Sequence, residues 1–160
     1  MAENRKIDKL RAFGYFGGKY YWLEELFANF PRDYKHFVDV FCGSMILSLN
    51  HPADRIITAN DIYDDIVNFF TVLRDHQDEL IQKLELTPYA KSEHERSYKR
   101  SKNKIENARR FFVRSRQSFY GLGVQRESKG WHMCKEKSVT EKAETLTKWN
   151  NSIARLSSVA

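Results

Sequence analysis

Apolar positions in the first half of the chain alternate between helical spacing and short runs of β-branched and aromatic residues. The leucines and phenylalanines of residues 20–30 recur at the spacing of one helix face, whereas residues 36–41 and 55–60 have the composition of strands. In chain order, the pattern predicts a helix over 20–30, a strand over 36–41, a turn at 42–44, a helix over 45–49, a strand over 55–60 and a mainly helical segment over 61–86. This alternation is typical of a parallel α/β sheet.

The second half of the chain has a different pattern. Residues 92–113 are polar with an apolar end, which predicts a helix, and the glycines and aromatic residues of 114–137 indicate a hairpin or an irregular loop. Residues 138–156 carry an apolar stripe and are expected to be helical. We therefore expect an α/β part over residues 1–86 and a mainly helical part over residues 87–160.

Charge separates the same two parts, although the net charge of the 160 residues is only +6. Residues 1–90 hold 10 Lys and Arg against 14 Asp and Glu, a net charge of −4, whereas residues 91–150 hold 16 against 7, a net charge of +9. A block this basic attracts phosphates and releases counterions when it binds nucleic acid. A solvated helix face is the alternative interpretation.

Composition excludes several classes of protein. With 41% hydrophobic and 14% aromatic residues the chain is not disordered, and no apolar run approaches the ~20 residues of a membrane helix. The first residues are polar and charged, which is unlike a secretory signal, and two cysteines, Cys42 and Cys134, are too few for a zinc site. We expect a cytoplasmic protein without a structural metal.

Three short segments combine glycines with side chains that bind ligands. Asp39-Val40-Phe41-Cys42-Gly43-Ser44 is a strand ending in a glycine turn, Asn60-Asp61 ends the next strand, and Tyr15-Phe16-Gly17-Gly18-Lys19 lies upstream. Ligands of open α/β sheets bind at the carboxyl ends of strands, where an acidic residue accepts from both ribose hydroxyls. The segments suit a cofactor with an adenine, a carboxylate and an amine. Taken singly, each is also compatible with a plain turn, a helix cap or a loop.

The order of these segments resembles the Dam-like class of DNA N6-adenine methyltransferases, from about residue 13 to the carboxyl end. Members have an aromatic residue or proline before Gly-Gly-Lys, then an acidic strand with a Phe-x-Gly-Ser turn, then Asn-Asp-Ile. The matching segments here are 16–19, 39–44, 60–62 and 67–70, followed by 86–89, 108–112 and 149–156 in the recognition insert.

The resemblance implies an α/β fold: a partial Rossmann-like sheet of the S-adenosylmethionine-dependent methyltransferases, with a mainly helical target-recognition insert. It implies S-adenosylmethionine as cofactor, with Asp61 on the ribose. The implied cofactor-binding positions are Tyr15, Gly17, Gly18, Lys19, Asp39, Phe41, Gly43, Ser44, Asp61 and Ile62. Met45 stands where the family often has glycine, so it either crowds the methionine moiety or simply starts the helix.

Double-stranded DNA is the implied partner, read by a hairpin or loop near residues 114–137. Phe119 and Tyr120 match the base-intruding position of the family. The implied DNA-binding positions are Arg114, Arg116, Ser118, Phe119, Tyr120 and Arg126. In the alternative interpretation, Phe119 packs under the loop and only the arginines face solvent. An RNA substrate is a further alternative, because nothing in the sequence settles whether a 2′-hydroxyl is read.

The family's catalytic motif, Asp-Pro-Pro-Tyr, is missing, because the three prolines Pro31, Pro52 and Pro88 are not adjacent to one another. No catalytic residue is therefore assigned. We hypothesise that the chain is the cofactor-binding and target-recognition half of a split or truncated enzyme, completed by a chain that carries Asp-Pro-Pro-Tyr. A non-catalytic DNA-binding protein and a purely structural fragment are the alternatives. Restriction-modification, host marking and phage self-protection are equally compatible settings.

Overall fold

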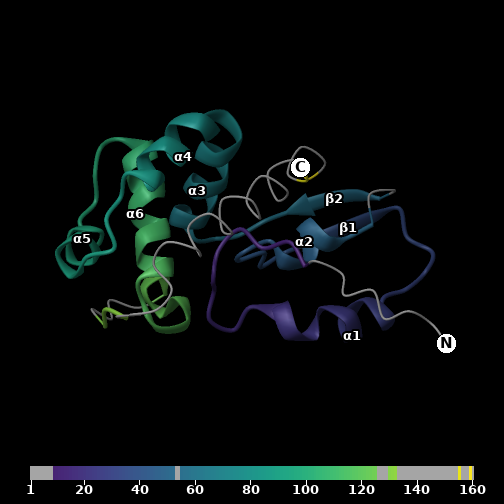
Figure 1. Cartoon of the computed structure of the whole chain (residues 1–160). Coiled ribbons are helices and arrows are strands. Elements are labelled where there is room, and N and C mark those ends of the chain that lie inside the picture. The colour runs from purple at the N-terminus through teal and green to yellow at the C-terminus, as the bar shows by residue number, and fades with distance from the viewer. Residues whose placement is uncertain (1–8, 53–54, 126–129, 133–154, 156–158, 160) are drawn as a thin grey trace.

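The computed structural model describes residues 9–52, 55–125, 130–132, 155 and 159. A small sheet with helices α1 and α2 lies at one end of the molecule, and helices α3 to α6 lie at the other (Figure 1). The elements are the 3-10 helix η1 (Lys19–Trp22), α1 (Leu23–Ala28), β1 (His36–Asp39), α2 (Ile46–Asn50), β2 (Ile56–Ala59), α3 (Asp64–Asp75), α4 (Gln77–Glu85), α5 (Lys91–Arg96), α6 (Lys104–Arg116) and the 3-10 helix η2 (Phe119–Val124).

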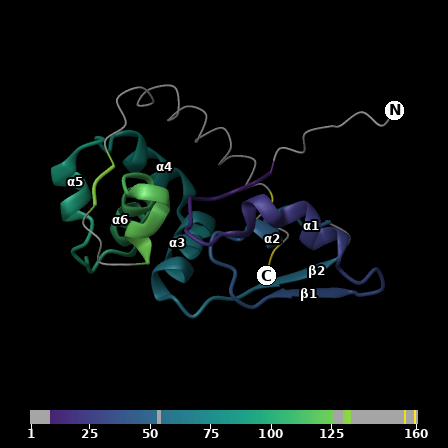
Figure 2. The ribbon, with the colours of Figure 1, turned by 90° about the horizontal axis from the view of Figure 1, so that it is seen from below.

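The described sheet has two parallel strands, β1 and β2, which pair from His36 with Ile56 to Asp39 with Ala59. Seen from below, α1 and α2 lie on one side of it (Figure 2). Side chains facing these helices, such as Ile57, are buried, whereas Val38 and Ile56 on the opposite face are exposed. The predicted parallel α/β arrangement is confirmed, and it leaves one sheet face without a covering helix among the described residues.

The larger core lies between α3 and α6, where phenylalanine rings pack closely. Phe69 of α3 and Phe111 of α6 are fully buried, with ring centroids 5.4 Å apart. Phe13, from the segment before η1, packs edge to face on both rings, at 5.2 Å and 4.9 Å. This segment therefore ties the amino-terminal loop to the helical half, and residues on both sides of the expected boundary at 86/87 share one core. The boundary itself stays a prediction.

The predicted continuous helix over 92–113 is wrong, because the chain leaves the helix at Ser97 and re-enters it at Lys104. The Ser97 hydroxyl donates to the His94 carbonyl at 2.5 Å, and the Asn103 side chain caps α6 by accepting from Glu106 N at 3.0 Å. Serine and asparagine compete with helical backbone bonds in this way, so they end one helix and begin the next.

The expected hairpin or loop over 114–137 begins later than predicted, since α6 continues to Arg116. The segment then forms η2 and one antiparallel bridge between Ser118 and Trp131.

Most of the predicted helix over 138–156 lies outside the described residues. No helix of the described residues is long and apolar enough to cross a membrane.

Candidate functional site

The turn after β1 is joined to the turn after β2 by the backbone and by one carboxylate. Cys42 N donates to the Asn60 carbonyl at 2.9 Å, which extends the strand pairing into the turns. The Asp61 carboxylate then accepts from Gly43 N at 2.9 Å and from Tyr63 N at 3.0 Å. Helix α3 begins beyond Asp61 with Tyr63 as its N-cap, so the alternative in which Asp61 caps this helix is wrong. Its carboxylate instead holds the two strand ends together.

Glycine is required in the first turn for conformation and for space. Gly43 has φ +50°, in the left-handed region that disfavours other residues, and a Cβ there would lie 3.2 Å from Tyr15 Cδ1. Met45 also has positive φ, at 55°, and its carbonyl accepts from Leu49 N at the start of α2. Met45 therefore starts the helix, as one of the two sequence interpretations expected.

The aromatic-Gly-Gly-Lys loop lies against this turn. Gly18 N donates to the Tyr15 carbonyl at 3.0 Å, and Lys19 Nζ donates to the Phe41 carbonyl at 3.5 Å. The side chain of Phe41 is 73% exposed at the same edge. Residues from two distant stretches of sequence thus meet at the carboxyl ends of β1 and β2.

Two of the predicted cofactor-binding residues, Asp39 and Ser44, are buried. Asp39 is 5% exposed and its Oδ2 accepts from the Ser48 hydroxyl at 3.0 Å, and Ser44 is also buried. Cys42 beside them has its pKa raised to about 12 by burial, then by Asp61 and Asp39. Its thiol is therefore protonated and is not a nucleophile at neutral pH.

A cleft of about 190 Å³ opens beside the same turns, between them and α3. Asp61, Cys42 and Met45 line it from the turns, and Ile66 and Phe70 line it from α3. Ile62, which was predicted to contact the cofactor, is 89% exposed at the start of this edge. The α3 residues were not predicted as part of the site, although their apolar helical spacing is visible in the sequence.

The predicted DNA-reading loop packs onto the predicted cofactor loop. Gly121 has φ +76°, and a Cβ there would collide with the Gly14 carbonyl oxygen. The same carbonyl accepts from the Ser115 hydroxyl at 2.7 Å, and Gln125 Nε2 donates to the Phe16 carbonyl at 2.8 Å. These contacts join residues about 100 positions apart, so nothing in the sequence signals them beyond the glycines themselves.

Phe119 and Tyr120 of η2 are exposed, next to the loop that was predicted to bind the cofactor. Phe119 is 52% exposed with its ring 4.5 Å from that of His132, and Tyr120 is 83% exposed with φ +51°. The alternative in which Phe119 is buried beneath the loop is wrong. Positive φ at a tyrosine is uncommon, and such strain gathers at functional sites.

The other predicted DNA positions have different surroundings. Arg114 is largely buried: it pairs with Asp65 at 2.8 Å and donates to the Ser97 carbonyl. The buried Ser118 hydroxyl accepts from Gly123 N at 2.9 Å, and Arg116 is half-buried. DNA contacts by these residues stay predictions, and Arg126 lies outside the described residues.

The comparison with protein families agrees with this geometry. Residues 15–151 match the model of the D12 class N6 adenine-specific DNA methyltransferases. The chain belongs to this family. The match begins at Tyr15 and spans both strand ends, α3, α6 and η2. The resemblance drawn from Gly17-Gly18-Lys19, Asp39 to Ser44 and Asn60-Asp61 is thereby confirmed at the level of the family, which methylates adenine in DNA.

Proposed function

We propose that this D12-class chain takes part in site-specific adenine-N6 methylation of double-stranded DNA, with S-adenosylmethionine as cofactor. The observation that carries the proposal is the meeting of three groups at one edge: the Tyr15–Lys19 loop, the turns joined by Asp61, and the exposed aromatic residues of η2. Methyl transfer to a base requires cofactor and extruded base side by side. An edge with these three groups has surface for the cofactor and for the extruded base.

The residues present fit the proposed cofactor. A carboxylate has about four lone-pair sites, and the described contacts of Asp61 use two of them, so Asp61 retains acceptors for ribose hydroxyls. Lys19 supplies a cation for the cofactor's carboxylate, and exposed Phe41 and Ile62 supply apolar surface for its adenine. The cofactor would contribute an electrophilic methyl group. Asp39 is buried, and we propose that it supports the turn from behind rather than contacting the cofactor directly.

The target base needs partners that this chain does not contain. Family members accept the amino protons of adenine with Asp-Pro-Pro-Tyr, and these 160 residues hold no Pro-Pro pair. We propose that a complementary chain or segment carrying this motif packs against the open sheet face, whose Val38 and Ile56 are exposed. Added strands would pair with the unpaired strand edges and complete a Rossmann-like sheet, and the helices that connect them would cover this face.

Tyr120 is the residue we propose to enter the DNA stack, with Phe119 beside it. Both are exposed next to the cofactor loop, and an aromatic ring can fill the gap that a flipped base leaves. The biological setting we propose is the cytoplasm, in restriction-modification, host marking or phage self-protection.

The alternative is a DNA-binding protein of this family without methyl transfer. A chimaera separates the two: residues 1–160 joined to the Asp-Pro-Pro-Tyr half of an active D12-class enzyme, assayed for labelled methyl transfer to adenine in duplex DNA. The proposal expects transfer that is lost in the Asp61→Ala chimaera. A chimaera that binds S-adenosylmethionine and DNA yet transfers nothing would favour the non-catalytic alternative, and one that binds no cofactor would contradict the proposal.

A further inference from the structure

A second basic surface lies outside the residues that were predicted to touch DNA. Residues 96–104, which run from the last residue of α5 to the first residue of α6 and which we call the basic loop, contain five cations in nine positions and no aspartate or glutamate. All five are exposed: Arg96, Lys99, Arg100, Lys102 and Lys104. We propose that the basic loop holds the backbone phosphates of duplex DNA, an inference that rests on the proposed function.

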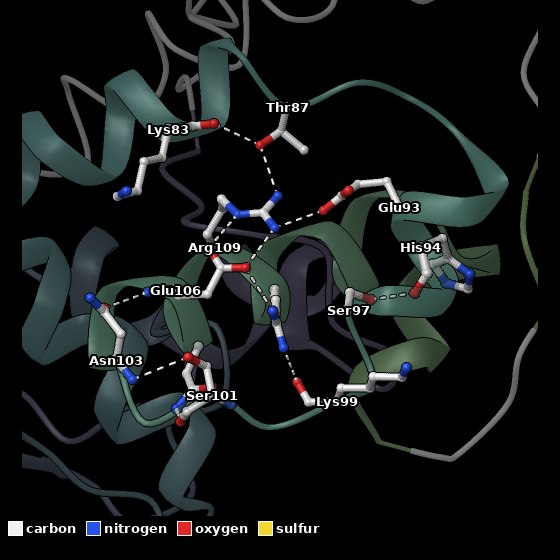
Figure 3. Close-up of polar contacts among 12 residues, drawn as sticks. Lys83, Thr87, Glu93, His94, Ser97, Lys99, Ser101, Asn103, Glu106 and Arg109 are labelled. Carbon is white, nitrogen blue, oxygen red and sulfur yellow. Dashed lines mark hydrogen bonds and ion pairs between the residues drawn. The ribbon is translucent and has the colours of Figure 1, made fainter.

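The backbone of the basic loop is held in place while its cations face solvent. Asn107 accepts from Ser101 N at 2.8 Å and donates to the Ser101 carbonyl at 2.7 Å. The Ser101 hydroxyl accepts from Asn103 N at 3.1 Å, and Arg110 donates to the Lys99 carbonyl at 2.6 Å. In Figure 3 the Lys99 carbonyl points into this network and its ammonium points away from it. A surface ordered in advance loses less entropy when it binds a ligand.

Three of these charges, those of Lys99, Lys102 and Lys104, are not used to stabilise the fold. Lys104 is the first residue of α6, at the positive end of the helix dipole, where a cation is unfavourable. Among the described residues, no carboxylate lies within ion-pair distance of Lys99, Lys102 or Lys104. Unpaired like charges gathered on one rigid loop are unfavourable unless an anion joins them, and the phosphates of DNA are such an anion.

The basic loop is attached to the helix that follows the candidate cofactor site. Arg100 pairs with Asp65 at 3.1 Å and the Asn68 side chain donates to the Lys104 carbonyl at 3.0 Å, so the loop is anchored to the first two turns of α3. Helix α3 begins three residues after Asp61. A duplex held on the basic loop would therefore lie beside the start of α3, which follows the strand-end turn at Asp61. Phosphate contacts of this kind set the register of DNA without reading its sequence.

The test measures binding of a short fluorescent duplex by anisotropy, from about 50 to 200 mM KCl, for the full chain with S-adenosylhomocysteine present. The variant Lys99→Ala/Lys102→Ala/Lys104→Ala should bind more weakly. The slope of log K against log salt should flatten by about 0.9 for each phosphate that is no longer neutralised, with sequence preference unchanged. The control Arg32→Ala/Lys35→Ala removes exposed cations before β1, at the opposite end of the strands, and should keep the parent's slope.

Melting temperature separates this role from a structural one. The triple variant should melt at or above the temperature of the parent, because it loses only like-charge repulsion and an unfavourable helix-end cation. A triple variant with the parent's salt slope would overturn the inference while leaving methylation by the chimaera intact. A parent that binds single-stranded RNA better than the duplex would also overturn it, whereas loss of cofactor binding would count against the proposed function instead.

Discussion

Asp61 links the architecture of the site to its chemistry, because one carboxylate accepts from the backbone of both strand-end turns. The sequence marked this residue by its place after the second strand. It did not show that the bond partner is Gly43, 18 positions earlier, or that the helix cap is a different residue. Both features depend on the parallel pairing of β1 with β2, which brings the two turns together.

Replacing Asp61 with alanine should weaken S-adenosylmethionine binding by the free energy of charge-assisted hydrogen bonds to the ribose, on the order of 1.5–3 kcal/mol. Isothermal titration calorimetry measures the dissociation constant. Asp64→Ala is the matched control, because Asp64 is exposed at the start of α3 and should leave the dissociation constant unchanged. An Asp61→Ala protein that binds as tightly as the parent would reduce Asp61 to a structural brace.

Gly121 and Gly17 form a matched pair for testing the contact between the two loops. Both have φ near +75°, but a Cβ at Gly121 would collide with the Gly14 carbonyl oxygen, whereas a Cβ at Gly17 would meet nothing within 4 Å. Gly17→Ala should cost about 1–2 kcal/mol of folding free energy, from backbone strain alone. Gly121→Ala should cost more, because the two backbones must also separate, and urea unfolding measures the difference. Equal destabilisation by the two variants would mean that η2 does not rest on Gly14.

At the scale of elements, a polar network joins α5 to α6. Arg109 pairs with Glu93 of α5 at 2.7 Å and with Glu106 of α6 at 2.8 Å, and it donates to the Thr87 hydroxyl at 3.0 Å (Figure 3). Hydrogen bonds from Arg109, and then from Arg110, lower the pKa of Glu106 from 4.5 to about 2. The short helix α5 depends on this network, because six residues are too few to be stable as an isolated helix.

The network makes stability depend on pH in a definite direction. Since the pKa of Glu106 is lower in the folded state, its contribution is complete above pH 4.5 and declines as pH falls toward 2. Glu106→Gln should therefore be less stable than the parent at neutral pH, and this difference should shrink below pH 4.5. Urea unfolding of both proteins across this range is the measurement. A difference that stays constant with pH would mean that the Glu106 charge contributes nothing.

The elements near the sheet were predictable because their signals are local. The β-branched runs, the glycine turn and the helical spacing of 20–30 each depend on neighbouring residues, and the structure agrees with them to within a few positions. The break between α5 and α6 was missed because Ser97, Asn103 and Asn107 act through specific hydrogen bonds rather than through periodicity. Composition alone does not separate a polar helix from two helices with a braced loop.

At the scale of the whole molecule, the candidate site forms where two distant parts of the chain meet. The family's motifs were recognisable in the sequence one by one, whereas the approach of η2 to Gly14 was not, because it joins residues far apart in the chain. Phe13, buried between α3 and α6, explains the approach by drawing the amino-terminal loop into the helical core.

The central claim is that S-adenosylmethionine binds at this edge, and nuclear magnetic resonance tests it most directly. Assigned amide spectra of the full chain should be recorded during titration with S-adenosylhomocysteine, the product form of the cofactor. The account predicts saturable shifts at Tyr15 to Lys19, at Phe41 to Ser44 and at Asp61 to Tyr63, with Lys35 at the far end of β1 unmoved. Shifts confined to other parts of the chain, or none at millimolar ligand, would contradict it.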